Sequence, residues 1–371
     1  LGNCQQNQRA ALHYSPNNNP LHRAASLFRE ALQSMLSPSI TQLSSFSDAV
    51  HIIRTYKTFA ALSPIPMFFH FTTNQAILDS ISDFFLPNST SIPQTSNILH
   101  VVDFDVGFGC QYAPLMKELA SAFSSSPEGS CKINSCLFLR VTAVVTEDYK
   151  IQPKLIKESL NQFAHDLDLQ FQIEFVPIQI FDILSFKSVK IACGEKTVVI
   201  LSQNVFRRLS VLNTMVPFVT ELRKVAPSVV ISTESEGWAV AAGMNALSFR
   251  KGLVNCLEFY SMVFDSLDVA ATTAACESED WATKVELLLL KPRIFAAMEG
   301  RRTGTSGPSW KEAFYGAGFR PIQQSRFTDF LVDCLLGKFH VRGFNVAKRH
   351  PEVVLCWHQR PLITTSAWRC S

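Results

Sequence analysis

Residues 99–110 read Leu-His-Val-Val-Asp-Phe-Asp-Val-Gly-Phe-Gly-Cys, and this stretch decides the fold. An apolar run ends in two acids and two spaced glycines, and the helix-like segment Gln111–Phe123 follows it. This is the pattern of a buried parallel strand that turns sharply into a helix in a doubly wound α/β fold. Glycine permits the tight turn and lets a ligand or a neighbouring helix approach the backbone. The stretch therefore predicts an α/β core with the kind of turn that opens nucleotide and S-adenosylmethionine sites.

Strands and helices alternate along the chain from residue 97. Five short, branched and apolar runs are typical of fully buried parallel strands: Leu99–Phe104, Cys136–Val145, Phe171–Pro177, Thr197–Ser202 and Ser228–Glu234. Between them lie the helical stretches Gln111–Phe123, Pro153–Leu167 and Leu212–Lys224. An extra strand is expected in Gly316–Gln323, and a hairpin is expected from Phe339–Val346 and Glu352–Trp357, joined by Ala347–Pro351. This order predicts a methyltransferase-like (Rossmann-type), seven-stranded and mostly parallel sheet with a C-terminal antiparallel hairpin.

The rest of the chain is mainly helical in pattern. Residues 1–20 are rich in Asn and Gln without periodicity and are expected to be a disordered lead-in. Apolar spacing predicts helices in Leu21–Leu36, Ser47–Ala60 and Ile65–Phe84, so residues 21–96 are expected to form a helical cap. We assign residues 97–238 to the α/β core, 239–301 to a helical insertion, and 302–371 to the end of the core. Because the first residue is Leu1, the natural N-terminus is expected to lie upstream.

Composition and charge exclude several classes of protein. A chain of 371 residues with 47% hydrophobic content can bury a large core. The net charge of +3 is too mild for an electrostatic nucleic-acid footprint. No run reaches the roughly 18 apolar residues of a membrane helix, so no membrane contact is expected. Ten scattered cysteines without a Cys-x-x-Cys pair argue against zinc and favour a reduced intracellular protein.

The turn after residue 103 contains a candidate cofactor pocket. Asp105, Gly107 and Gly109 are placed to let the backbone approach the methionine part of S-adenosylmethionine, and Glu147 or Asp148 to hold the ribose hydroxyls. Asp182 could contact the adenine. The alternative is purely structural, because acids and glycines collect at the ends of strands in any fold of this kind. Residues 202–206 also lack the Asn-Pro-Pro-aromatic pattern of amino-group methylation, so we expect no catalytic residue, no cofactor and no metal.

The remaining acidic, basic, histidine and tryptophan residues of interest are interpreted mainly as structural or surface residues. Glu234 and Glu236 could mimic a catalytic pair but fit a solvated strand end better. The short basic runs are interpreted as surface charges: Arg207-Arg208, Arg301-Arg302 and Lys348-Arg349-His350. No zinc-finger, homeodomain or basic-zipper motif is present, so contact with DNA is expected to be indirect. His100 is expected to be a satisfied core histidine and Trp357 a core residue, whereas Trp368 fits a core or an interface.

Several motifs resemble those of one plant family. Leu99-His100-Val101-Val102-Asp103 resembles the VHIID motif of the plant GRAS regulators, and the closing Ser366-Ala367-Trp368 resembles their SAW motif. Similar words follow in family order at Leu222–Val230, Phe264–Leu267, Trp310-Lys311 and Ala317–Pro321. The variants Val341–Phe344 and Leu355–Trp357 resemble the Hairy Meristem type of scarecrow-like protein most closely. The chain departs from the family pattern at Cys110, usually glycine, at Tyr112, usually tryptophan, and at Ala239–Asn245, which replaces a common Asn-His-Asn run.

The resemblance covers about residues 20 to 370 and identifies residues 21–371 as a single GRAS domain. It implies a nuclear transcriptional regulator of plant development, for example of meristem programmes, that acts as a protein-interaction scaffold. Transcription factors of the homeodomain or zinc-finger type are the implied partners, and association with other GRAS proteins is a further one. The alternative is a protein that binds S-adenosylmethionine or another small molecule, or a methyltransferase, using the loop Asp105–Gly109.

The helices before the sheet are the expected partner surface. Their apolar stripes are broader than one packing face needs, and an amphipathic helix with exposed aromatic residues is a common recognition device. The residues expected to contact a partner are Leu21, Phe28, Leu32, Phe68, Phe69 and Phe71.

Overall fold

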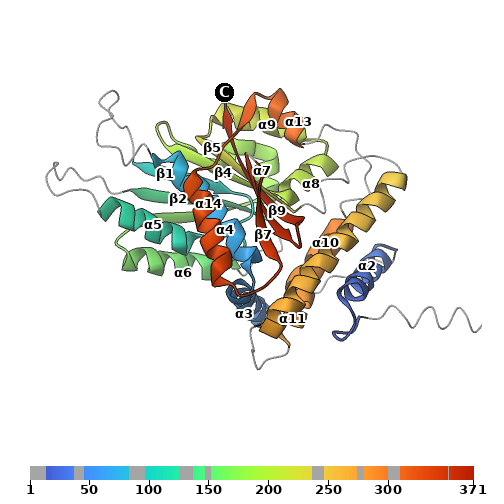
Figure 1. The fold of residues 1–371 in the computed structure, drawn as a ribbon. Helices are drawn as coiled ribbons and strands as arrows, with labels where there is room; N and C mark the ends of the chain where they lie inside the picture. Colours follow the sequence, from blue (N-terminus) through green and yellow to red (C-terminus); the bar gives the residue numbers. More distant parts are fainter. Residues whose placement is uncertain are drawn as a thin grey trace, which may run out of the picture.

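A mixed β-sheet forms the centre of the computed structural model, with helices on both faces and a helical layer beside its antiparallel end (Figure 1). The structure describes residues 14–36, 46–82, 97–124, 137–146, 152–235, 246–273, 280–299, 310–349 and 351–371. The strands are β1 (Ile98–Asp103), β2 (Phe138–Val145), β3 (Gln170–Pro177), β4 (Lys196–Ser202), β5 (Val229–Ser235), β6 (Phe319–Ile322), β7 (Phe344–Arg349), β8 (Glu352–Trp357) and β9 (Arg360–Cys370). Their order is β3-β2-β1-β4-β5-β9-β8-β7, and β6 pairs with β9. The predicted α/β class with a mostly parallel sheet is confirmed.

The five parallel strands form the first part of the sheet. Each lies within two residues of its predicted bounds. β1 pairs in parallel with β2 on one side and with β4 on the other. The chain therefore builds the sheet outward in both directions from β1, and the strand order reverses between β1 and β4. In open α/β sheets, ligands bind in the crevice outside the carboxyl ends of the strands at such a reversal.

The antiparallel part differs from the prediction. The sheet has nine strands within the described residues, not seven. The strand β9, eleven residues long, was not expected; it pairs with β5, β8 and β6. β7 begins at Phe344 rather than at residue 339, because Gly343 turns there with φ +113°; a Cβ at this position would lie 2.7 Å from the ring of Trp357. The predicted hairpin partner β8 and the extra strand β6 are present.

The side chains of the parallel strands point alternately to the two faces of the sheet, where they pack in two separate hydrophobic cores. Leu99 and Val101 of β1 join the cluster beneath α5 (Tyr112–Ser124) and α6 (Gln152–Asp166). Val102 and Phe104 face the opposite cluster, because successive residues of a strand point to opposite faces. The second cluster is covered by α7 (Ile178–Leu184), the 3-10 turn η3 (Ser185–Val189), α8 (Gln203–Val211), α9 (Met215–Val225) and α13 (Trp310–Gly316). Both faces of the parallel strands are thus buried, as their apolar sequences predict.

The N-terminal helices separate into two groups. α2 (Pro20–Leu36) and α3 (Phe46–Leu62) pack with α10 (Ala246–Thr273), α11 (Trp281–Lys284), the π-helical segment η4 (Val285–Leu290) and α12 (Lys291–Glu299). α4 (Pro64–Ser80) instead lies on the sheet, against β5, β9 and α14 (Arg326–Lys338). Pro64 separates α3 from α4 and is the first residue of the second helix, a position that tolerates its missing N–H. α10 and α2 therefore lie side by side, at the lower right of Figure 1.

Candidate functional site

The carboxylate of Asp103, the last residue of β1, accepts its hydrogen bonds from residues of the turn and of the helix that follow it. This fully buried carboxylate accepts hydrogen bonds from the backbone N–H of Asp105 at 2.8 Å and from the Tyr112 hydroxyl at 2.6 Å. The amide of Gln111 donates a third bond at 3.3 Å. Burial raises the pKa of Asp103 to about 7, although the bonds from Tyr112 and from the Asp105 N–H oppose the rise. The carboxylate thus closes the strand–helix joint with groups of the chain itself.

The two glycines of the turn have different roles. Both adopt left-handed conformations, with φ +50° at Gly107 and +69° at Gly109. A Cβ at Gly109 would lie 2.9 Å from Ile156 Cγ2 and 3.2 Å from Leu160 Cδ1, so this glycine allows α6 to pack against the turn. A Cβ at Gly107 would meet nothing closer than the Asp105 carbonyl at 4.0 Å. Gly107 therefore presents open backbone, whereas Gly109 is covered by a helix.

A cavity of about 230 Å³ lies where the sheet meets the helical layer. The carboxyl ends of β1, β4 and β5 form its floor, and α3, α4, α10, η4 and α12 form its walls. Its polar lining residues are Tyr56, His70, Asp105, Gln111, Ser202, Gln203, Asn204, Thr233, Glu234, Ser235 and Arg293. It lies at the strand-order reversal between β1 and β4, the expected place for a ligand in this fold.

The predicted cofactor pocket is only partly assembled around this cavity. Asp105 and Gly107 line it, whereas Gly109 does not and packs under α6. Glu147 and Asp148 lie outside the described residues. Asp182 forms an ion pair with Arg208 between α7 and α8. No group of three or more potential metal ligands occurs in the part of the chain that the structure describes.

The charged groups of the cavity have distinct surroundings. Burial raises the pKa of Asp105, while the positive charge of Arg293 and the Ser202 hydroxyl lower it. The hydroxyl of Tyr56 lies 3.1 Å from Nε2 of His70. Burial lowers the pKa of His70 to about 4, so this ring is neutral at physiological pH. Glu234, expected at a solvated strand end, is instead 8% exposed and lies 3.8 Å from the ammonium of Lys311.

The residues of the VHIID-like motif are structural. Leu99, Val101 and Val102 are fully buried in the two cores. His100 is also fully buried, with Nδ1 3.0 Å from Glu195 and Nε2 2.9 Å from the Thr142 hydroxyl. Burial and the neighbouring Arg140 charge lower the pKa of His100, against the opposing effect of Glu195. The prediction of a satisfied core histidine is confirmed.

The closing Ser366-Ala367-Trp368 lies inside β9. These three residues pair with Ser232, Ile231 and Val230 of β5. Trp368 is 1% exposed, and its indole N–H donates to the Ser366 hydroxyl at 2.9 Å. Its ring contacts those of Trp310, Phe314 and Tyr315, with centroids 5.3–5.5 Å away. The core interpretation of Trp368 is therefore correct, as is that of Trp357, whose indole N–H donates to Asp265 at 2.8 Å.

The proposed partner contacts require a correction. Phe28 is 3% exposed and packs edge-on against Tyr260 of α10, and Phe68 is fully buried beneath α14. Leu32 is partly buried in the cluster that contains Phe28, Phe71 in the cluster that contains Phe68, and Phe69 against the core beneath α5 and α6. Leu21, 47% exposed, remains open to solvent. The apolar stripes of these helices are broad because two faces of each helix are buried within the chain. A sequence alone does not distinguish such a stripe from one that is exposed to a partner.

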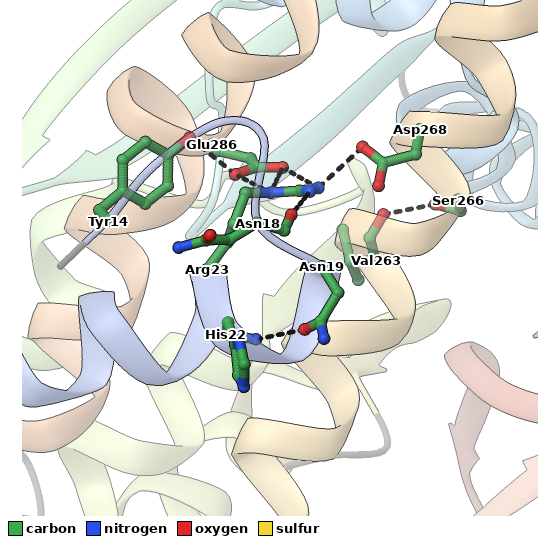
Figure 2. Close-up of polar contacts among 9 residues, drawn as sticks. All are labelled: Tyr14, Asn18, Asn19, His22, Arg23, Val263, Ser266, Asp268 and Glu286. Carbon is green, nitrogen blue, oxygen red and sulfur yellow. Dashed lines mark hydrogen bonds and ion pairs between the residues drawn. The ribbon is translucent and has the colours of Figure 1, made fainter. Parts of the chain in front are cut away.

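An ion network that joins α2 to the insertion was not predicted (Figure 2). Arg23 is 3% exposed; its Nε lies 3.1 Å from both carboxylate oxygens of Glu286, and its Nη2 donates to Glu286 Oε1 at 2.9 Å and to Asp268 at 2.7 Å. The Tyr14 hydroxyl donates to Glu286 at 2.9 Å. Burial raises the pKa of Glu286, while its bonds with Arg23 oppose the rise. An arginine in the apolar stripe of α2 was the available signal, because a buried arginine needs an acidic partner.

One side chain in each of two basic runs is paired with nearby acids. Arg208 is paired with Asp182, and the ammonium of Lys348 lies 3.5 Å from Asp329 and 3.8 Å from Asp333. Arg301-Arg302 and His350 lie outside the described residues. None of the helices that the structure describes is long and apolar enough to cross a bilayer.

Comparison with known proteins places these features in one family. The model of the GRAS domain family matches residues 6–369. Scarecrow-like protein 15 of Arabidopsis thaliana is 48% identical over 361 residues, which is 96% of this chain and 68% of that protein. Scarecrow-like protein 6 of the same plant is 29% identical over 360 residues, 96% of this chain and 57% of that protein.

A solved structure agrees with the sequence comparisons. The crystal structure of SCL7 in Oryza sativa matches with a TM-score of 0.70 and 25% identity, over 98% of this chain and 93% of that one. The Hairy Meristem type is named in none of these matches and stays a prediction. The family model covers nearly the whole chain, and the relatives and the fold agree with it; the chain belongs to the GRAS domain family.

Proposed function

We propose that this chain is a nuclear regulator of transcription in plant development that acts as a protein-interaction scaffold. The match of residues 6–369 to the GRAS domain family carries the proposal, and the Scarecrow-like relatives support it. DNA-binding factors of the homeodomain or zinc-finger type would be its partners, with other GRAS proteins as a second class. These factors would read the bases, and the chain would reach DNA through them.

The charge distribution supports an indirect route to DNA. Proteins that bind DNA directly neutralise phosphates with clustered lysine and arginine side chains. Here the net charge is +3, and the basic side chains of Arg208 and Lys348 are paired with acids of the same chain. The positive charge of one side chain in each of two of the three short basic runs is therefore offset within the chain.

The turn after β1 supports a role without methyl transfer. A methyltransferase of this fold would hold its cofactor at this turn, but of the three turn residues predicted for that role only Asp105 and Gly107 line the cavity. Gly109 instead lies under α6, which leaves no room for a ligand at this glycine. We therefore expect no transfer of a labelled methyl group from S-adenosylmethionine to nuclear proteins by the purified chain. Transfer that is abolished by Gly107→Val would establish the enzymatic alternative.

The experiment that tests the scaffold is immunoprecipitation from plant nuclei. The full chain is captured with and without prior nuclease digestion, and the recovered proteins are identified by mass spectrometry. The expected result is that homeodomain or zinc-finger factors remain after digestion, because the contact is between proteins. Loss of every such factor on digestion would mean that DNA bridges them, and the scaffold proposal would be wrong.

A further inference from the structure

The cavity between the sheet and the helical layer contains an unsatisfied buried polar atom. Gln111 is 2% exposed and belongs to the cavity wall; its amide nitrogen donates to Asp103. Its carbonyl oxygen Oε1 has no hydrogen-bond partner among the described residues. A buried acceptor without a partner is unfavourable, so such atoms in native proteins usually face a water molecule or a ligand. A hydrogen-bond donor bound in the cavity could therefore satisfy the Gln111 carbonyl oxygen.

The buried charge around the cavity is negative. Asp105 lines the floor, where the charge of Arg293 acts on it from the solvent side, and Glu234 lines the same side, 3.8 Å from the ammonium of Lys311. His70 is neutral at physiological pH because burial lowers its pKa to about 4. Arg293 is the only cationic side chain among the described lining residues, and it is exposed to solvent. The interior thus offers acceptors and negative charge, and its positive charge lies on the solvent side.

Aromatic rings form much of the cavity wall. The rings of Tyr56 and Phe108 lie with centroids 5.0 Å apart, and those of Phe259 and Tyr260 lie 5.2 Å apart. The faces of such rings attract cations as well as apolar groups. The volume of about 230 Å³ is below the roughly 300–1,000 Å³ of pockets for drug-sized molecules. A single ring with a short side chain suits this space better than a nucleoside cofactor does.

We propose that this cavity binds a small organic amine, with its ammonium group against the Asp105 carboxylate and the Gln111 carbonyl oxygen, and its apolar body among Tyr56, Phe108, Phe259 and Tyr260. The ammonium supplies the missing donor to Gln111 and competes with Arg293 as a positive charge for Asp105. The wall residues come from the sheet side and from α3, α4, α10, η4 and α12. Binding would therefore hold the helical layer on the sheet and raise the stability of both together.

The test uses three probes of one shape on the full chain: phenethylamine, 2-phenylethanol and phenylacetate. Binding is measured by isothermal titration and by the shift in melting temperature. Phenethylamine is expected to bind at least about tenfold more tightly than the neutral and anionic probes, a ratio worth about 1.4 kcal/mol. This comparison uses the wild-type chain and does not depend on whether any variant folds. Tighter binding of 2-phenylethanol or phenylacetate would overturn the proposal.

Two substitutions at the cavity give opposite expected effects. Asp105→Asn removes the counter-charge and is expected to weaken phenethylamine binding at least about tenfold. Arg293→Gln removes a competing cation and is expected to strengthen it. Asp166→Asn, on the exposed surface of α6 and outside the cavity wall, is the matched control and should change neither affinity nor melting temperature.

Three other outcomes would overturn the proposal. Phenylacetate binding that Arg293→Gln abolishes would identify an anion site instead. Protection by S-adenosylmethionine at micromolar concentration, without any response to phenethylamine, would assign the cavity to that cofactor. If no probe binds at millimolar concentration, the cavity holds water only, since a polar cavity of this kind can be filled by water.

Discussion

The hydroxyl of Tyr112, the first residue of α5, donates a 2.6 Å hydrogen bond to the carboxylate of Asp103, the last residue of β1. This bond ties the start of the helix to the end of the strand across the turn where related folds place a ligand. With the bond from the Asp105 N–H, it makes the turn a structural joint. The cavity lies on the other side of this joint, where Asp105 and Gly107 line it beneath the helical layer.

Two buried groups are expected to change stability with pH in opposite directions. The pKa of Asp103 is raised in the folded state from 3.8 to about 7, so its contribution is present below pH 4 and is lost as the pH rises toward 7. The pKa of His70 is lowered from 6.5 to about 4, so its contribution is present above pH 6.5 and is lost as the pH falls toward 4.

Urea unfolding between pH 4 and pH 8 separates these two contributions. In Asp103→Asn the unfolding free energy should rise more steeply with pH than in the wild type, because the falling contribution is gone. In His70→Gln it should rise less steeply, because the rising contribution is gone. Identical slopes in the wild type and both variants would show that neither group has a shifted pKa.

Substitutions of three glycines should separate packing from backbone conformation. Gly109→Ala creates contacts of 2.9 and 3.2 Å with Ile156 and Leu160 and keeps a left-handed φ, so it should be the most destabilising. Gly107→Ala meets no close neighbour and should cost about 1–2 kcal/mol for its left-handed backbone alone.

Gly337→Ala is the matched control in α14. No atom lies within 4 Å of the added Cβ, and alanine is a better helix former by about 1 kcal/mol, so this variant should be stabilised. The unfolding free energies from urea titrations give the order. Equal losses for Gly107→Ala and Gly109→Ala would mean that α6 does not rest on the turn.

Removing Arg23 should strongly destabilise the helical layer. The side chains of Arg23 and Glu286 are 4% and 2% exposed, and loss of one partner from such a pair costs about 3–5 kcal/mol because the other charge stays buried. Arg23→Met should therefore lower the unfolding free energy by that amount and increase proteolysis within α2. The double variant Arg23→Met, Glu286→Leu should recover much of the loss.

The exposed pair Arg360 and Glu258 is the control for this cycle. Their side chains are 56% and 50% exposed, so Arg360→Met should cost no more than about 1 kcal/mol. Losses of similar size for Arg23→Met and Arg360→Met would contradict the role of the buried network.

Truncation of Trp368 should affect stability first and partner binding second. The residue is 1% exposed, and replacing a buried tryptophan by alanine costs about 3–5 kcal/mol. Trp368→Ala should lower the melting temperature and the soluble yield. Ser366→Ala, which removes only the 2.9 Å bond to the indole, should have a much smaller effect. Unchanged stability of Trp368→Ala with selective loss of one partner would place the residue in an interface.

The parallel half of the fold could be predicted because its signals are local. Branched apolar runs such as Val198–Leu201 are buried on both faces, and the glycines at 107 and 109 mark the turn directly. β9 was not predicted, because Thr364, Thr365 and Ser366 interrupt the apolar run by which a buried strand is recognised. These side chains are buried, and the Thr365 hydroxyl lies 2.9 Å from that of Thr72 on α4. That contact joins residues 293 positions apart, which no local pattern contains.

The candidate site was predictable only on the sheet side. Asp105 and Gly107 stand out because they follow a buried strand, and both line the cavity. Tyr56, His70 and Arg293 come from helices distant in sequence, where their types do not differ from those of ordinary helix residues. The same limit explains Phe68: its helix packs on the sheet with one face and on α14 with another, so exposure could not be inferred.

The most direct test of the indirect route to DNA is in vitro selection from a random duplex library at physiological salt. The purified chain alone is expected to enrich no sequence and to retain duplexes only with dissociation constants of about 10⁻⁴–10⁻⁶ M, as in non-specific binding. With a zinc-finger or homeodomain factor added, the chain should retain the sequence that this factor reads. Enrichment of a defined motif by the chain alone, bound at nanomolar concentration, would contradict the scaffold role.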